Sequence, residues 1–111
     1  RVVEDSGGKY VLAVFANNEQ VNKEVWEKIL SSYPKMASAK LDQEKPDKLL
    51  TEFCSEEKLE CYLMLPYFKE YLTQNPNKTT HFRYDGHLNE IGTELTTKFL
   101  TEKLKAYFSI K

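Results

Sequence analysis

Residues 10–16 read YVLAVFA, and this short apolar run decides how the rest of the chain is interpreted. It is rich in β-branched and aromatic residues, and it lies between a pair of glycines and a pair of asparagines. A continuous apolar run of this kind predicts a strand that is covered on both faces, as strands of parallel sheets are. Residues 59–65, LECYLML, form a second such run, which Pro66 ends. We therefore predict two buried strands.

Helical periodicity fills most of the remaining sequence. Apolar residues recur at helical spacing over residues 21–33, and a proline in the first turn opens a second helix over residues 46–57. We predict a short helix over residues 66–72 and a long one over residues 89–108, whose first residue is an asparagine that can cap it. Residues 36–41 alternate too briefly to decide between strand and loop, and we interpret them as a short strand.

The order of these segments places the chain in the α/β class. Strands that alternate with amphipathic helices imply a three-layer α/β/α fold with a mostly parallel sheet and right-handed crossovers. A chain of 111 residues allows one domain, to which we assign residues 1–111 as a whole. Because the chain opens with RVVEDSGG, without a methionine or an apolar signal segment, we expect it to be a portion of a larger domain.

Composition excludes several classes of partner. The 16 basic and 17 acidic side chains give a net charge of −1, which argues against binding to nucleic acid or to an anionic membrane surface. The longest apolar run, residues 10–16, is far shorter than the roughly 20 residues that a membrane-spanning helix needs. The sequence has no Walker loop, dinucleotide-binding fingerprint or His-rich cluster, so we predict neither a cofactor nor a metal ion.

The interpretation of two sequence features, a pair of cysteines and a glycosylation triplet, depends on the compartment in which the protein works. Cys54 lies near the end of a predicted helix and Cys61 at the start of a predicted strand, so a disulfide across that turn is geometrically possible. Two half-buried thiols are an equally good interpretation, and the redox compartment stays open. Asn77, Lys78 and Thr79 match an acceptor for N-linked glycosylation, which has meaning only in a secretory context.

The candidate catalytic residues lie between a polar loop and the long C-terminal helix. His81 and His87 are the only histidines, and imidazole is the side chain best suited to proton transfer near neutral pH. His87 follows Asp85 and Gly86, on a loop of the kind that binds ligands in open α/β sheets. The Asp85 carboxylate can accept the Nδ1 proton and leave Nε2 to act as a general base. The alternative is that Asp85 caps a turn and His87 is a solvated loop residue.

Residues 85–92, DGHLNEIG, followed by a long amphipathic helix, resemble the final block of the SGNH (GDSL-type) esterase and lipase superfamily. Upstream, residues 17–21, 46–53 and 63–68 are similar to the last strands and helices of that fold. In this superfamily the terminal Asp and His complete a triad whose Ser lies near the start of the domain. The resemblance therefore implies a flavodoxin-like domain, of which this chain is the C-terminal portion.

The resemblance also implies a function, the hydrolysis of small acyl esters by an O-acyl or O-acetyl esterase or a lipase-like acylhydrolase. His87 is then the general base and Asp85 orients it. One residue separates them, whereas the commonest form of the superfamily's block has two, and the Gly-Asp-Ser block of the nucleophile is absent from residues 1–111. We expect the chain alone to be nearly inactive, and to bind either the missing N-terminal half of its domain or a second copy of itself.

Other residues of the chain do not replace the missing groups. Ser6 lies in the sequence DSGG, which we interpret as a turn before a strand, and the other serines lack the signature of a strained nucleophile turn. We interpret Asn17 and Asn18 as a helix-capping pair rather than as donors to an oxyanion.

A second class of function stays open. The chain can be a non-catalytic α/β module that keeps the architecture for binding or assembly. The sequence does not specify the acyl group or the compartment, although an extracytoplasmic location is favoured. Residues upstream of Arg1 would distinguish the two classes, because the hydrolase requires a Gly-Asp-Ser block there.

Overall fold

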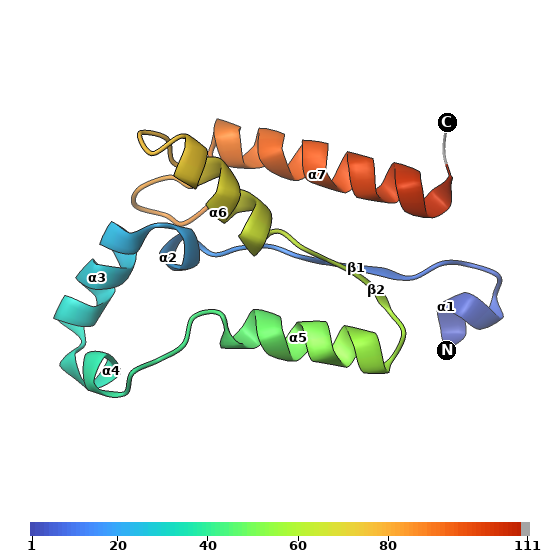
Figure 1. Cartoon of the computed structure of the whole chain (residues 1–111), viewed down its shortest axis with the longest axis horizontal. Coiled ribbons are helices and arrows are strands. Elements are labelled where there is room, and N and C mark those ends of the chain that lie inside the picture. The colour runs from blue at the N-terminus through green and yellow to red at the C-terminus, as the bar shows by residue number, and fades with distance from the viewer. Residues whose placement is uncertain (110–111) are drawn as a thin grey trace.

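The computed structural model describes residues 1–109, and most of them are helical. Helices account for 59% of the structure, and strands are confined to two short segments. In chain order the elements are α1 (Val2–Asp5), β1 (Val11–Val14), α2 (Asn18–Val21), α3 (Lys23–Ser32), α4 (Pro34–Ser38), α5 (Lys45–Glu56), β2 (Glu60–Leu63), α6 (Leu65–Gln74) and α7 (Glu90–Phe108). The strands run through the middle of the molecule, with α5 on one side and α6 and α7 on the other (Figure 1).

The two strands form a parallel pair. Val11 of β1 lies opposite Glu60 of β2, and Val14 lies opposite Leu63. Helices α2 to α5 connect the strands, because a parallel pair requires a long crossover. Each strand is four residues long, and this pair is the whole of the sheet within residues 1–109.

The predicted three-layer α/β/α fold is therefore wrong. A mostly parallel, flavodoxin-like sheet needs several strands to carry a layer of helices on each face. Here a single pair of strands provides the sheet, and helices supply most of the structure. The segment predicted as a further strand, residues 36–41, lies in α4 and the turn that follows it.

Local signals explain where the helices differ from the prediction. Pro34 occupies the first turn of α4, where its fixed φ favours a helix and no N–H group is lost. The single helix predicted over residues 21–33 is divided at Asn22, whose backbone is extended (φ −113°, ψ 106°). The Asn22 side chain accepts hydrogen bonds from the N–H groups of Glu24 and Val25, and this cap begins α3 as a separate helix.

Other local predictions are confirmed. Helices α5, α6 and α7 form where helical periodicity predicts them, and Asn89 caps α7 by accepting a hydrogen bond from the N–H of Gly92 (2.9 Å). The two cysteines form a disulfide that joins Cys54 of α5 to Cys61 of β2, which decides between the alternatives that the sequence left open. None of the helices in the described part of the chain is long and apolar enough to cross a membrane.

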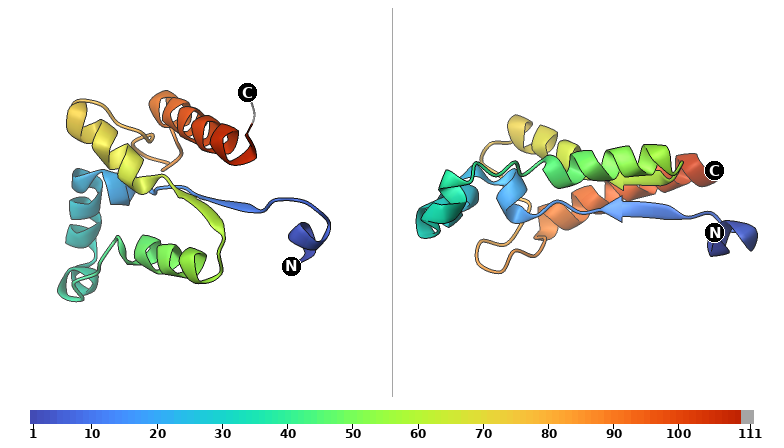
Figure 2. Two further views of the ribbon diagram at one scale, coloured as in Figure 1. Left: turned by 45° about the vertical axis from the view of Figure 1, so that its right-hand side comes forward. Right: turned by 90° about the horizontal axis from the view of Figure 1, so that it is seen from below.

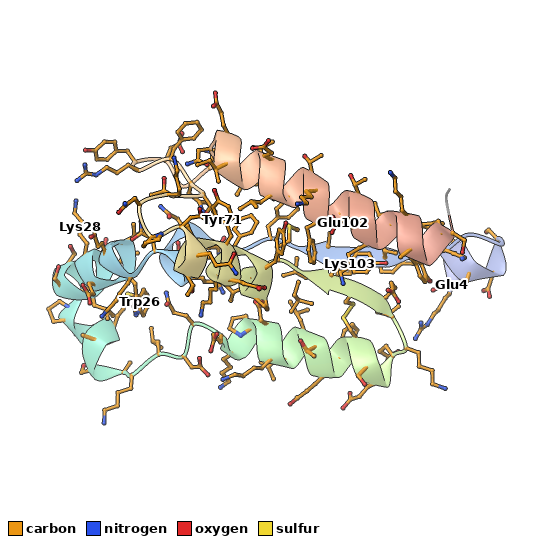
Figure 3. The ribbon with its side chains drawn as sticks, turned by 45° about the horizontal axis from the view of Figure 1, so that its top comes forward. Glu4, Trp26, Lys28, Tyr71, Glu102 and Lys103 are labelled. Atoms are coloured by element: carbon orange, nitrogen blue, oxygen red, sulfur yellow. A yellow bond between two sulfur atoms is a disulfide. The ribbon has the colours of Figure 1, made fainter. Side chains whose placement is uncertain are left out.

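The core is small and lies where the strands end. Its apolar cluster comprises Ala16, Met64, Leu65 and Phe68, and half-buried side chains of α7 pack against it. Figure 3 shows side chains crowded between α6 and α7, beside Tyr71. All four residues of β1 and three of the four residues of β2 are half-buried, so the prediction that both strands are fully buried is wrong.

The molecule is extended for its length. Its radius of gyration is 16.5 Å and its principal extents are 50 × 30 × 23 Å, whereas a compact domain of this length has a radius of gyration of about 13 Å. Figure 2 shows the residues before β1 at one end of the molecule, where the Arg1 guanidinium donates to the Glu57 carboxylate just after α5 (2.9 Å). Tyr10 and Phe15, which flank β1, are both exposed. Part of the strand pair is therefore left without a covering layer.

Candidate functional site

His87 is presented by a short loop between α6 and α7. The N–H of Phe82 donates a hydrogen bond to the carbonyl oxygen of His87 (2.8 Å), which closes the loop over residues 82–87. The residues that flank this loop, His81 and Leu88, pair with each other through an isolated antiparallel bridge. We call residues 82–87 the His87 loop. Its two ends are held together, and His87 is its last residue.

Asp85 and His87 lie together in this loop. The carboxylate oxygen Oδ1 of Asp85 accepts a hydrogen bond from the backbone N–H of His87 (2.9 Å) and lies 3.4 Å from the ring nitrogen Nδ1. Both side chains are exposed, the ring of His87 to 82% and the Asp85 carboxylate to 61%. No residue in the range 1–109 bonds to Nε2 of His87. The structure thus brings the two predicted residues together and leaves the second ring nitrogen open to solvent.

His81 is the buried counterpart of His87, with 4% of its surface exposed. Its Nε2 lies 3.0 Å from the carbonyl oxygen of Ala16, and its Nδ1 lies 2.9 Å from the hydroxyl oxygen of Thr80. A carbonyl oxygen can only accept, so Nε2 carries a hydrogen, and in the neutral ring Nδ1 accepts from the Thr80 hydroxyl. Burial lowers the pKa of His81, although the Ala16 carbonyl opposes that shift. His81 therefore anchors the base of the His87 loop to Ala16, two residues after the end of β1.

Asn89 and Gly92 fix the start of α7 against the same base. The Asn89 amide nitrogen donates to the carbonyl oxygen of Thr79 (2.9 Å), while its amide oxygen caps the helix at the Gly92 N–H (2.9 Å). A Cβ atom at Gly92 would overlap the carbonyl oxygen of Thr80, so only glycine allows this close approach. Asn89 and Gly92, which both belong to the motif at residues 85–92, thus have structural roles: Asn89 caps α7, and Gly92 allows close packing against Thr80.

The imidazole of His87 does not pack against the fold, unlike the other side chains of the motif that shape the turn or contact the core. Gly86 takes a left-handed φ of +75°, which suits glycine, and Leu88 packs against the apolar core. Asp85 shapes the turn through the N–H of His87. The ring of His87 contacts the Asp85 carboxylate and otherwise faces water. Structure alone does not require a histidine at this position.

Exposed aromatic side chains flank the candidate site. Tyr84 is 85% exposed and Phe82 is 52% exposed, both within the His87 loop. The guanidinium of Arg83 lies 5.4 Å from the centre of the Tyr84 ring, at the distance of a cation–π contact. The loop therefore carries apolar surface next to His87 that a covering group can bury.

The two asparagines after β1 have different roles. Asn17 caps α2 in a capping box, in which the Gln20 side chain accepts from the Asn17 N–H (2.9 Å). Asn18 lies in the first turn of α2 and is buried beside a hollow of about 330 Å³ that Thr80 and Lys78 also line. The predicted capping pair is thus confirmed for Asn17 and wrong for Asn18.

The described residues do not complete a catalytic site by themselves. The hydroxyl groups of Ser31, Ser32 and Ser38 donate to carbonyl oxygens of their own helices, and that of Ser6 donates to the carbonyl oxygen of Val2. Within residues 1–109 no Ser hydroxyl bonds to His87. The same part of the chain holds no group of three or more His, Cys, Asp and Glu side chains that could bind a metal ion.

No family model, curated protein or solved structure matches this chain.

Proposed function

We propose that this chain carries the histidine and aspartate of a Ser-His-Asp triad that hydrolyses small acyl esters. His87 is the general base and Asp85 orients its ring. The contact between the Asp85 carboxylate and Nδ1 of His87 (3.4 Å), with Nε2 left open, is the observation that carries the proposal. The resemblance of residues 84–92 to the final block of the SGNH superfamily supports it.

The arrangement suits proton transfer at Nε2. A carboxylate next to Nδ1 favours the tautomer that has its hydrogen on Nδ1, which leaves the lone pair of Nε2 to accept a proton. His87 takes the proton of a serine hydroxyl as the serine oxygen attacks the ester carbonyl, and then gives it to the leaving alcohol. Water hydrolyses the acyl-enzyme by the same route. In this structure the 3.4 Å contact between Oδ1 and Nδ1 has the distance of an ion pair but not the geometry of a hydrogen bond, and catalytic hydrogen bonds often form fully only when the substrate is bound.

We assign the nucleophilic serine and the oxyanion donors to a segment outside residues 1–111. The exposed Phe82 and Tyr84 support this assignment, because a general base works best where water is excluded. A segment that covers these two rings would bury apolar surface and enclose His87 in the same step.

Hydrolysis of p-nitrophenyl acetate tests the proposal. We expect background rates for the 111-residue chain and measurable turnover when the preceding segment of its polypeptide is joined to Arg1. In that longer polypeptide, His87→Ala removes the general base and lowers kcat by about 10²- to 10⁴-fold. Asp85→Asn also lowers kcat, because the ring loses its charged partner.

Glu94→Gln is the matched control, since Glu94 lies on the exposed face of α7 and we expect unchanged kcat. Circular dichroism establishes that each variant is folded. Equal turnover with and without the added segment contradicts the proposal, as does unchanged kcat in the folded His87→Ala variant.

The second candidate function is a non-catalytic binding or assembly module. The exposure of the His87 ring and the half-buried faces of β1 favour it, since both are surfaces that a partner can cover without chemistry. A folded His87→Ala variant that keeps partner binding and shows no change in any ester turnover would favour this function.

A further inference from the structure

We propose that Asn77 is the attachment site of an N-linked oligosaccharide. This inference is independent of the proposed hydrolase function. It rests on two observations: the acceptor triplet at residues 77–79, which is meaningful only in a secretory compartment, and the disulfide between Cys54 and Cys61.

The acceptor triplet lies on an accessible loop. Asn77, Lys78 and Thr79 follow α6, and all three are exposed. The N–H of Lys78 donates to the carbonyl oxygen of Asn75 (3.0 Å), so Asn77 lies in a tight turn that projects from the end of the helix. The middle residue is a lysine, as the acceptor pattern allows any residue except proline there.

The Asn77 side chain is free for modification. Within the part of the chain that the structure describes, its amide makes no hydrogen bond, whereas the amide of the neighbouring Asn75 donates to the carbonyl oxygen of Tyr71 (2.9 Å). An oligosaccharide on Asn77 therefore displaces no hydrogen bond among the described residues. Asn77 is the only asparagine of the sequence that is followed two residues later by Ser or Thr without an intervening proline.

The disulfide is the second observation. Cys54 of α5 is buried, and its sulfur is bonded to that of Cys61 at the start of β2. Structural disulfides form and persist in oxidising compartments and are rare in the cytosol. A chain that acquires this bond in a secretory lumen meets, in the same lumen, the enzymes that glycosylate asparagine.

The modification is a glycosyl transfer. The Asn77 amide nitrogen forms a bond to the anomeric carbon of an oligosaccharide that is carried on a polyisoprenyl diphosphate. The bond between that carbon and the diphosphate oxygen breaks, the lipid diphosphate leaves, and the amide loses one proton. The lipid-linked donor is supplied by the lumenal oligosaccharyl transfer machinery, and this chain provides only the acceptor.

An oligosaccharide at this position has a consequence for docking. Asn77 borders the hollow of about 330 Å³ between the α2–α3 turn and the loop after α6. A bulky, hydrated group there keeps this side of the molecule in water. A partner that covers β1 or the His87 loop must therefore approach without covering Asn77.

The test is to direct the 111-residue chain into the secretory pathway of a eukaryotic host and to measure the intact mass with and without peptide-N-glycosidase treatment. Cell-retained and secreted material are both analysed, because the transfer occurs on entry into the lumen. We expect an oligosaccharide that the glycosidase removes, with conversion of Asn77 to Asp. Wild-type chain in which the disulfide is formed and Asn77 is unmodified overturns the proposal.

Three variants assign the site. Asn77→Gln and Thr79→Ala abolish the mass shift, because each breaks the acceptor pattern. Thr79→Ser keeps the acceptor pattern, so we expect it to remain glycosylated. It also keeps a hydroxyl oxygen that can accept from the Asn89 amide, which makes it the control for the hydrogen bond that Thr79→Ala loses. Because the Asn77 amide has no hydrogen-bond partner within residues 1–109, we expect Asn77→Gln to leave stability unchanged. A shift that persists in Asn77→Gln overturns the assignment.

Discussion

At the scale of single residues, two histidines that are close in sequence have opposite surroundings. His81 is buried and both of its ring nitrogens have partners, at the Ala16 carbonyl and the Thr80 hydroxyl. His87 is exposed, and among the described residues its side chain forms an ion-pair contact with the Asp85 carboxylate alone. The first holds the loop in place, and the second is available for chemistry.

Burial of His81 makes the stability of the fold depend on pH. Its pKa is lowered from 6.5, chiefly by burial, so the unfolded chain binds the proton more readily than the folded chain does. The stabilisation is fully present above pH 6.5 and is lost as the pH falls below that value toward the lower pKa of the folded state. We expect the free energy of unfolding from urea titrations to decrease more steeply with falling pH in the wild-type chain than in His81→Gln. Identical slopes in the two proteins contradict this account.

The two histidines also show what sequence can predict at this scale. The spacing of Asp85 and His87 is local, so it predicts their contact directly. One of the two partners of His81 is Ala16, which is 65 positions away in the chain. Nothing in the residues around His81 specifies that contact, because it depends on how β1 and the loop before α7 come together.

At the scale of elements, the predictions that succeed rest on strong local signals. The apolar stripe and the Asn89 cap define α7, and the first-turn proline defines the start of α5. The prediction fails at α4, where Pro34 outweighs a weak alternation, and at Asn22, where a side-chain cap interrupts a continuous stripe. The apolar runs predict β1 and β2 correctly as strands, yet they cannot specify how many further strands join them.

The start of α7 provides a test at this scale. Alanine favours a helix over glycine by about 1 kcal/mol, whereas a Cβ at Gly92 overlaps the Thr80 carbonyl oxygen. We expect the steric overlap to outweigh the gain in helix propensity. Gly92→Ala should therefore lower the free energy of unfolding, measured in urea titrations, by about 1–3 kcal/mol. Thr101→Ala, on the exposed middle of the same helix, is the control and should change it by less than about 0.5 kcal/mol. A Gly92→Ala protein as stable as the wild type excludes the close approach.

At the scale of the whole molecule, the fold has too little core for its length. The apolar cluster gathers at one end of the strand pair, and the radius of gyration of 16.5 Å reflects an open arrangement of helices. The apolar content of the sequence predicts that a core forms. Composition does not show whether this chain alone supplies all the helices and strands that cover the core. The expectation that the chain binds its other half or a second copy of itself therefore stays a prediction.

The central claim is that Asp85 holds His87 with Nε2 open, and the tautomers of the two histidines test it most directly. Long-range ¹H–¹⁵N spectra of the ¹⁵N-histidine-labelled chain, recorded at about pH 8.5 where imidazoles are ordinarily neutral, report which nitrogen carries the hydrogen. We expect Nδ1–H at His87 and Nε2–H at His81, the latter serving as an internal reference. Asp85→Asn should shift His87 toward Nε2–H and leave His81 unchanged. A wild-type His87 that carries its hydrogen on Nε2, with no response to Asp85→Asn, contradicts the account.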